Sequence, residues 1–168
     1  MNKEIYLLVG IPGSGKTTYC KKLEKEFEEK NISVTYISRD EHRKKLTNAA
    51  TGKFYFSKEK EVFSNYIESI NNAIKENKEK IIIDATHINH VSRNKVLSRL
   101  KNKNEYTLVV VTFKLPLELA LKRNGQREGF ARVPDNSIEI MKNSFESPTM
   151  VEFEKYNFRS THLVNFYE

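Results

Sequence analysis

The chain has 168 residues, 38% of them hydrophobic and 11% aromatic, and its formal net charge is +7. This length fits one domain with its own core, and no apolar run approaches the ~18 residues of a transmembrane helix. A single cysteine, Cys20, excludes a disulfide framework and a cysteine-built zinc site, so we expect a cytoplasmic protein. A phage- or virus-encoded protein acting in the host cytoplasm fits this expectation too.

Short apolar runs alternate with amphipathic stretches along the chain. Five runs predict strands, at residues 5–9, 32–37, 80–84, 106–113 and 161–166. Five stretches predict helices, at residues 16–30, 58–76, 91–102, 116–124 and 136–146. Strands that alternate with helices form βαβ units, so the predicted fold class is α/β: a parallel sheet of about five strands with helices on both faces.

Ligands of such sheets bind at the carboxyl ends of the strands. Residues 10–17, Gly-Ile-Pro-Gly-Ser-Gly-Lys-Thr, follow the first predicted strand and match G-x-x-x-x-G-K-[ST], the phosphate-binding P-loop. Lys16 should reach the β- and γ-phosphates, and the Thr17 hydroxyl should help to hold Mg²⁺. The residues expected to bind the donor are Gly13, Ser14, Gly15, Lys16, Thr17 and Thr18. The alternative is a glycine turn that only leads into a helix.

Asp84 ends the apolar run Ile81-Ile82-Ile83, as the acid of a Walker-B strand does. It would orient Mg²⁺ or one of its waters. The alternative is a carboxylate that caps the following turn. The two motifs together predict a P-loop NTPase-type sheet that binds ATP, or another nucleoside triphosphate, with Mg²⁺.

Two further clusters favour a phosphotransferase. Asp40, after the second predicted strand, is placed to accept a proton from an incoming hydroxyl, and Arg43 one turn later could clamp a phosphate of the acceptor. The alternative is an N-cap aspartate among surface basic residues. Arg123 and Arg127 lie four residues apart near two glycines, as in a mobile lid that closes over a triphosphate. A solvated basic helix end is the alternative there.

The order of these motifs resembles the kinase domain of phage-type 5′-polynucleotide kinases, from residue 5 to about residue 147. The matching segments are the P-loop at 10–18, Arg39-Asp40 with Arg43, Thr86 with Asn89, Lys122-Arg123-Asn124 with Arg127, and Val133-Pro134. The resemblance implies that Asp40 activates the 5′-hydroxyl and that Arg43 and Thr86 hold the acceptor's 3′-phosphate, with Arg39 and Asn89 on the same acceptor side. It also implies that Arg123 and Arg127 contact the donor phosphates, which makes Lys16, Asp40 and Arg123 the catalytic set.

The acceptor side departs from the family's pattern. Ala85 separates Asp84 from Thr86, and Ser38 and His87 stand where the family has asparagines. No D-x-D-x-T phosphatase motif occurs, so we expect one P-loop kinase domain over residues 1–168, with an arginine lid near 122–134.

Two compositional features bear on the acceptor. The aromatic run Phe54-Tyr55-Phe56 could stack acceptor bases or could pack a long connection onto the core. Residues 135–168 carry a net charge of −3, which leaves +10 on residues 1–134. Six arginines lie in or just beyond the segments that follow predicted strands and in the lid: Arg39, Arg43, Arg93, Arg123, Arg127 and Arg132. The net charge alone would fit any polyanion binder, whereas this placement of the arginines favours a phosphotransferase.

We therefore expect an enzyme that transfers the γ-phosphate of ATP to the 5′-hydroxyl of RNA or DNA, as in nucleic-acid repair. Its partner would be a nucleic acid with a 5′-OH end and not a membrane, and the sequence leaves homo-oligomerisation open. The alternatives are a P-loop kinase for a small-molecule hydroxyl and a switch protein that hydrolyses nucleotide without an acceptor.

Overall fold

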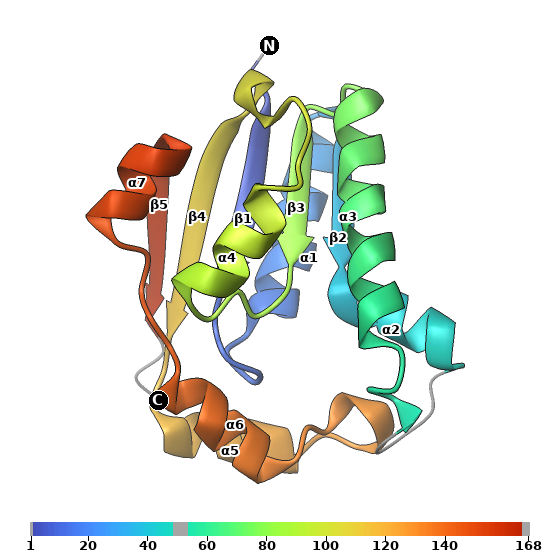
Figure 1. Ribbon diagram of the computed structural model, residues 1–168, viewed down its shortest axis with the longest axis vertical. Coiled ribbons are helices and arrows are strands. Elements are labelled where there is room, and N and C mark those ends of the chain that lie inside the picture. The colour runs from blue at the N-terminus through green and yellow to red at the C-terminus, as the bar shows by residue number, and fades with distance from the viewer. Residues whose placement is uncertain (1, 49–53, 166–168) are drawn as a thin grey trace.

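The computed structural model describes residues 2–48 and 54–165, with side chains described as far as residue 158. Its centre is a parallel sheet with the strand order β2-β3-β1-β4-β5 (Figure 1). The strands are β1 (Glu4–Val9), β2 (Val34–Ser38), β3 (Lys80–Asp84), β4 (Thr107–Lys114) and β5 (Phe158–Asn165). All run in the same direction, so their carboxyl ends share one edge of the sheet.

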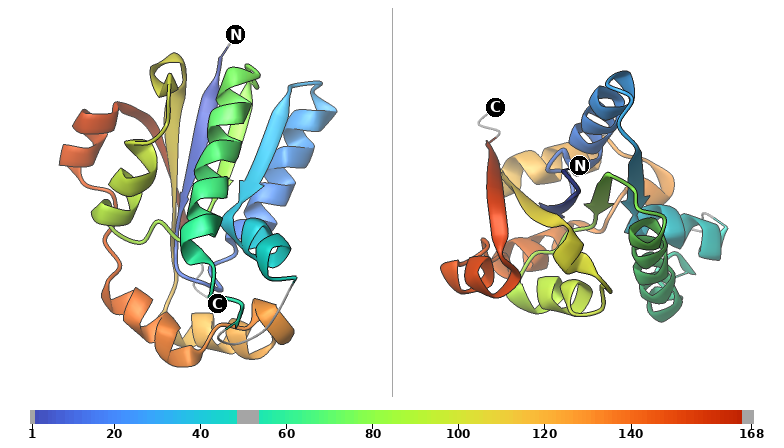
Figure 2. Two further views of the ribbon diagram at one scale, coloured as in Figure 1. Left: turned by 45° about the vertical axis from the view of Figure 1, so that its right-hand side comes forward. Right: turned by 90° about the horizontal axis from the view of Figure 1, so that it is seen from above.

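Helices cover both faces of the sheet and its carboxyl edge (Figure 2). α1 (Lys16–Glu29) lies on one face, and α3 (Glu59–Lys75), α4 (His90–Leu97) and α7 (Met150–Tyr156) lie on the other. At the carboxyl edge are α2 (Arg39–Thr47), α5 (Leu117–Gly125) and α6 (Asp135–Asn143), with the short 3₁₀ helix η3 (Gly129–Ala131) between the last two. Another 3₁₀ helix, η2 (Lys103–Glu105), precedes β4. None of the helices within the described ranges is long and apolar enough to span a membrane.

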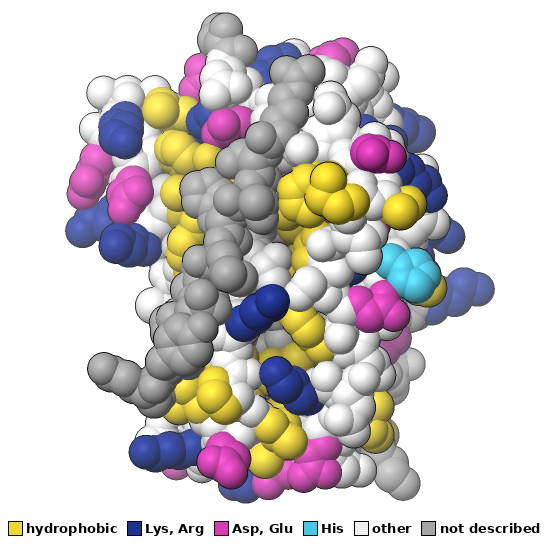
Figure 3. Space-filling view, turned by 90° about the vertical axis from the view of Figure 1, so that its left-hand side faces the viewer, with side chains coloured by type: hydrophobic (Ala, Val, Ile, Leu, Met, Phe, Trp, Pro, Cys, Tyr) yellow, Lys and Arg dark blue, Asp and Glu magenta, His cyan; other side chains and the backbone are white. Residues whose placement is uncertain are grey.

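β3 shows why the central strands contain consecutive apolar residues. Ile81 and Ile83 pack among residues of α3 and α4, whereas Ile82 packs on the opposite face with residues of α1. All three side chains are completely buried. Because both faces of the strand are covered, it shows no alternation of polar and apolar residues. Figure 3 shows the side of the molecule where β5 forms the edge of the sheet, and the described side chains there include charges of both signs among apolar groups.

The α/β fold predicted from the sequence is confirmed, and the differences lie at element ends. β2 begins at Val34 because residues before it close α1: the Ile32 N–H donates to the Phe27 carbonyl at 3.0 Å. The helix predicted over 91–102 ends at Leu97, and Asn102 has a φ of 55°, which ends helical geometry. Residue 166, the end of the last predicted strand, lies outside the described residues.

The sequence did not predict α2 and α7. Ser38 caps α2 by accepting the Glu41 N–H at 3.3 Å. Thr149 and Glu152 cap α7 reciprocally, since the side chain of each accepts a hydrogen bond from the backbone N–H of the other. Asp40 therefore lies in the first turn of a helix and is not itself the cap.

Candidate phosphotransfer site

The P-loop joins β1 to α1 in a tight turn. Gly13 and Gly15 have φ angles of 83° and 90°, a region that side-chain-bearing residues rarely adopt. A Cβ on Gly13 would stand 3.0 Å from the Ala120 carbonyl oxygen, so α5 packs directly against the loop. The loop's first residue, Gly10, donates its N–H to the Thr86 carbonyl at 2.9 Å. The P-loop is thereby fixed to α5 and to the segment that follows β3.

Lys16 and Thr17 open α1 directly beneath this loop. The Lys16 ammonium donates to the Ile11 carbonyl at 2.9 Å and to the Ser14 hydroxyl at 3.3 Å. The Thr17 hydroxyl donates to Asp84 Oδ2 at 3.1 Å. The phenol of Tyr36 donates to the same oxygen at 2.6 Å. Both predicted metal-holding groups are thus in contact, across a sequence separation of 67 residues.

Burial shifts the pKa values of both charged groups beneath the P-loop, Lys16 and Asp84. It lowers the pKa of the Lys16 ammonium, and the carboxylates of Asp84 and Asp40 oppose that effect. It raises the pKa of Asp84, and the Lys16 ammonium with the Tyr36 and Thr17 hydroxyls opposes the rise. Low-dielectric surroundings strengthen the attraction of Lys16 for an added anion. Within the described ranges, no three His, Cys, Asp or Glu side chains gather as a metal site. One carboxylate and one hydroxyl fit a Mg²⁺ that also takes phosphate oxygens and waters.

The second cluster lies at the start of α2. The Asp40 side chain is 72% exposed and pairs with Arg43, which is nearly buried. Glu59, the first residue of α3, holds Arg43 through two hydrogen bonds, at 2.5 Å to Nε and 3.0 Å to the terminal nitrogen. The same carboxylate accepts from Arg39 at 3.2 Å. Burial alone would raise the pKa of Glu59, but its hydrogen bonds from Arg43 lower it. Two predicted acceptor-side arginines are thus brought together by one carboxylate.

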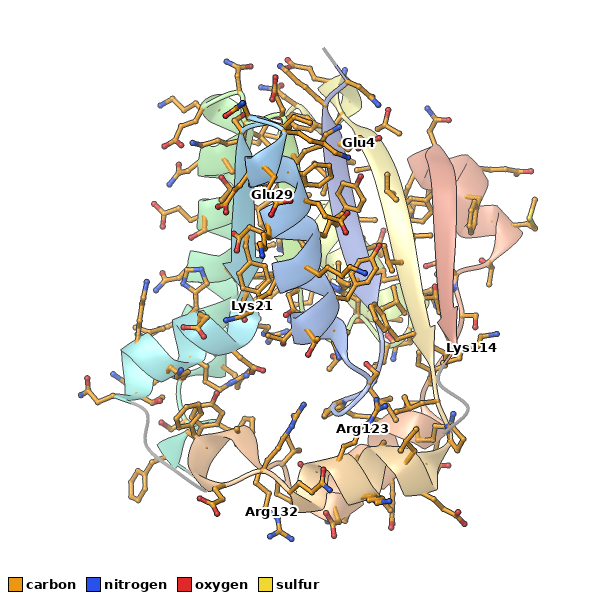
Figure 4. The ribbon with its side chains drawn as sticks, turned by 180° about the vertical axis from the view of Figure 1, so that it is seen from behind. Glu4, Lys21, Glu29, Lys114, Arg123 and Arg132 are labelled. Carbon is orange, nitrogen blue, oxygen red and sulfur yellow. The ribbon has the colours of Figure 1, made fainter. Side chains whose placement is uncertain are left out.

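The arginine lid, residues 122–134, crosses below the P-loop (Figure 4). Arg123 donates to the Gly13 carbonyl at 3.1 Å, so it is more than a solvated helix end. α5 ends at Gly125, and Arg127 consequently lies beyond the helix and not on its face. Its charge nevertheless acts on Lys16, whose pKa it lowers together with burial. Of the two lid arginines, Arg123 thus contacts the P-loop directly, and Arg127 acts on it through its charge.

Buried Asn124 joins the two ends of this lid. Its side-chain amide donates to the Val133 carbonyl at 2.6 Å and to Asp135 at 3.0 Å. Its carbonyl oxygen accepts the Val133 N–H at 3.0 Å. Residues 125–132 thus form a closed loop held at its base.

The segment after β3 carries the remaining predicted residues. Thr86 is partly buried, and its backbone contacts the P-loop as described. The Asn89 side chain caps α4, where its oxygen accepts the Ser92 N–H at 2.9 Å. Between them His87 is buried, hydrogen-bonded to the Leu8 carbonyl at 2.6 Å and to the Tyr66 hydroxyl at 3.3 Å. Burial lowers the pKa of His87 to about 4, so the imidazole is neutral and shapes this segment structurally.

One of the six arginines that the sequence groups with the site lies in the core instead. Arg93 is completely buried and pairs with Glu152 at 2.8 and 3.0 Å. It also donates to the His87 and Glu146 carbonyls, at 2.8 and 3.0 Å. Arg93 therefore fastens α7 and the end of the α6–α7 connection to α4, and it is not available to an anion.

Sequence reasoning missed three residues of the site: Tyr36, Glu59 and Asn124 as the lid's tie. Tyr36 and Glu59 act on partners 48 and 16 residues away, and neither lies in a motif. An available signal for Glu59 was its place in the first turn of a predicted helix, where acids are favoured. Nothing comparable marks Tyr36 within its strand.

The chain is similar to several known proteins. A model of the AAA domain family matches residues 5–148. A curated L-seryl-tRNA(Sec) kinase of Methanococcus maripaludis is 29% identical over 148 residues, which are 86% of this chain and 53% of that protein. The chain thus spans about half the length of the curated relative it matches.

Solved structures show the same fold. Kti12 of Chaetomium thermophilum, in complex with ADP-AlF3, has a TM-score of 0.67 at 18% identity, over 97% of this chain and 89% of that one. A chain of the Pnkp1/Rnl/Hen1 RNA repair complex has a TM-score of 0.66 at 24% identity, over 94% of this chain and 47% of that one. The P-loop NTPase-type fold inferred from the residues is thereby confirmed.

Proposed function

Since the chain belongs to the AAA domain family and is an ATP-dependent P-loop kinase, we propose that it phosphorylates the 5′-hydroxyl end of RNA or DNA. The observation that carries the proposal is the arrangement of Asp40. Its carboxylate lies in the first turn of α2, directly after β2 at the carboxyl edge of the sheet, and pairs with Arg43, which Glu59 holds in place. A carboxylate at the edge of the sheet that carries the P-loop, paired with a fixed arginine, suits the activation of a hydroxyl on a phosphate-bearing acceptor.

Donor binding falls to the P-loop and the lid. The triphosphate would replace the Ile11 carbonyl and Ser14 hydroxyl as partners of the Lys16 ammonium. Arg123, which contacts the P-loop, and Arg127, whose charge acts on Lys16, would neutralise charge on the transferring group. Thr17 and Asp84 would hold Mg²⁺, which supplies charge neutralisation at the β- and γ-phosphates when bound.

The acceptor hydroxyl would lose its proton to Asp40. The oxygen of the acceptor hydroxyl would form the new bond to the γ-phosphorus while the bond from that phosphorus to the β–γ bridging oxygen breaks, and ADP would leave. Because this chemistry needs little covalent help, the rate depends on positioning and charge stabilisation. Glu59 positions Arg43, and Arg43 would hold a phosphate of the acceptor near Asp40.

A second candidate acceptor is the hydroxyl of a seryl group on tRNA. The L-seryl-tRNA(Sec) kinase relative favours it, since the match extends over 86% of this chain. Both candidates are hydroxyls carried by a nucleic acid, and both suit the net +10 of residues 1–134.

A labelling panel tests the proposal. The protein is incubated with γ-labelled ATP and Mg²⁺ in the presence of 5′-hydroxyl RNA and DNA oligonucleotides, seryl-tRNA, and small alcohols that include gluconate. We expect label on the oligonucleotides and none on matched oligonucleotides with a 5′-phosphate. Label confined to seryl-tRNA would transfer the function to the second candidate. Label confined to small alcohols, or hydrolysis without any labelled acceptor, would refute both.

Ionic strength gives an independent check on the acceptor. Oligonucleotide phosphorylation through several phosphate contacts should weaken steeply with added salt, whereas a small neutral acceptor should show little dependence. A flat salt response of the acceptor KM would contradict a polynucleotide substrate.

A further inference from the structure

An aromatic cavity opens beside the proposed acceptor site. It has a volume of about 770 Å³ and lies between the turn at residues 55–56 and the lid, within the range typical of ligand pockets. Its lining includes Tyr55, Phe56, Phe130, Arg132, Val133 and Pro134. The two walls are about 75 residues apart in the sequence, and the fold alone brings them together (Figure 1).

The walls of this cavity are rings with cations against them. The Tyr55 and Phe130 rings are 5.9 Å apart between centroids, and Tyr55 and Phe56 are 5.0 Å apart. Lys44 places its ammonium 4.5 Å from the Phe130 ring. Tyr55 is buried, but Phe56 keeps 41% of its surface exposed beside the cavity. The one acid in the lining, Asp135, already accepts from Asn124.

The cavity adjoins Asp40 through Arg43. The Arg43 guanidinium lies 5.5 Å from the Tyr55 ring centre and 5.2 Å from that of Phe56, and it pairs with Asp40 on its other side. A group attached to a hydroxyl at Asp40 can therefore extend past Arg43 onto the rings. Flat, apolar walls of this kind match a planar heteroaromatic ring, and they offer an acyclic polyol few hydrogen-bond partners.

We propose that this cavity binds the nucleobase of the nucleotide whose 5′-hydroxyl is phosphorylated. The inference rests on the proposed function and adds to it a requirement for a base at the acceptor end. The sequence left open whether the run Phe54-Tyr55-Phe56 stacks bases or packs the core. The burial of Tyr55 fits core packing, whereas the exposed ring of Phe56 and the partly buried ring of Phe130 supply the stacking surface.

The test compares acceptors that differ only in the terminal base. The probes are a 5′-hydroxyl oligonucleotide ending in adenosine, the same oligonucleotide with an abasic first residue, and free adenosine. We expect wild-type kcat/KM to favour the base-bearing end roughly five- to hundredfold, the range of one base–aromatic stack. If free adenosine is phosphorylated and replacing a ring of the cavity lowers that activity too, the cavity binds the base of a nucleoside and does not require an oligonucleotide end.

Three matched variants locate the effect. Phe56→Leu and Phe130→Leu keep an apolar side chain at partly exposed positions, so the fold should persist. Each should lower kcat/KM for the base-bearing acceptor and leave the abasic one unchanged. Phe54→Leu is the control, because Phe54 lies in the same run, is 75% exposed and does not line the cavity.

Two outcomes overturn the inference, and they are distinguishable. Equal transfer to base-bearing and abasic ends, or equal losses on both in the two variants, refutes the base subsite while the kinase function stands. Transfer to none of the three acceptors refutes the proposed function, and the subsite falls with it.

Discussion

Replacing Asp40 by asparagine separates its chemical role from any structural one. The side chain is 72% exposed and pairs with Arg43, which keeps its two hydrogen bonds to Glu59 when Asp40 is neutral. Losing an exposed ion pair of this kind costs about 0–1 kcal/mol. Losing a general base should lower kcat by about 10²–10⁴-fold, equivalent to roughly 3–5 kcal/mol of activation free energy. The expected loss of activity therefore far exceeds the expected loss of stability.

Donor binding should survive this substitution. Asp40 and the triphosphate both carry negative charge near Lys16, so removing the carboxylate should leave the Kd for ATP unchanged or lower it. Transfer of labelled γ-phosphate gives kcat, equilibrium binding of an ATP analogue gives Kd, and urea denaturation gives stability. The matched control is Glu41→Gln, which removes the same charge one residue along the first turn of α2.

The reasoning fails in two ways. Near-normal kcat in Asp40→Asn would remove Asp40 from the base role. An equal loss of kcat in Glu41→Gln would show that turnover depends on negative charge in the first turn of α2, and not on one specific proton acceptor.

Three further substitutions probe the frame around the site. Arg93→Met should destabilise the fold by about 3–5 kcal/mol in urea denaturation, because it leaves Glu152 charged and buried; a loss below about 1 kcal/mol would contradict this. His87 has a folded-state pKa of about 4 against about 6.5 when unfolded, so it binds fewer protons in the fold and its stabilisation is full above about pH 6.5. Between pH 7 and 5 the free energy of unfolding of the wild type should therefore fall by about 2 kcal/mol more than that of His87→Asn. Asparagine is chosen because it tolerates the φ of 41° at this position. Equal falls in the two proteins would refute the conclusion that His87 is neutral in the fold. Asn124→Ala removes three hydrogen bonds at the base of the lid, and we expect faster tryptic cleavage after Arg127 and a raised KM for ATP, with unchanged cleavage as the contrary result.

The central strands and long helices were predictable because each satisfies a local rule. β3 has three consecutive isoleucines at its centre, as burial on both faces favours, and α3 repeats apolar residues at helical spacing. α2 escapes such reading because its sequence, Arg-Asp-Glu-His-Arg-Lys-Lys-Leu-Thr, has almost no apolar residue to form a stripe. α7 is seven residues long, too short for periodicity to stand out, and it depends on its capping box and on Arg93.

The candidate site likewise has one part that the sequence predicts and another that it does not. The P-loop is a contiguous pattern whose residue types follow from phosphate chemistry, so the sequence predicts its contacts with Asp84 and the lid in outline. The acceptor side is built from pairs distant in the chain. Glu59 accepts from Arg39 and Arg43 there, and on the donor side Tyr36 donates to Asp84, yet no spacing rule connects these residues before the chain folds.

The position of a charged residue in the sequence indicates less about phosphate binding than the partners of its side chain in the fold. Arg93 lies just beyond the segment that follows a predicted strand, and sequence position alone groups it with Arg39, which lies in such a segment. In the structure Glu152 and two carbonyls occupy Arg93 in the core, whereas Arg39 and Arg43 share Glu59 at the carboxyl edge of the sheet. Two guanidinium groups, those of Arg39 and Arg43, face two carboxylates, those of Glu59 and Asp40, so this cluster is balanced in formal charge. An incoming acceptor phosphate would therefore meet individual guanidinium donors held in place, and not a field set by the net +7.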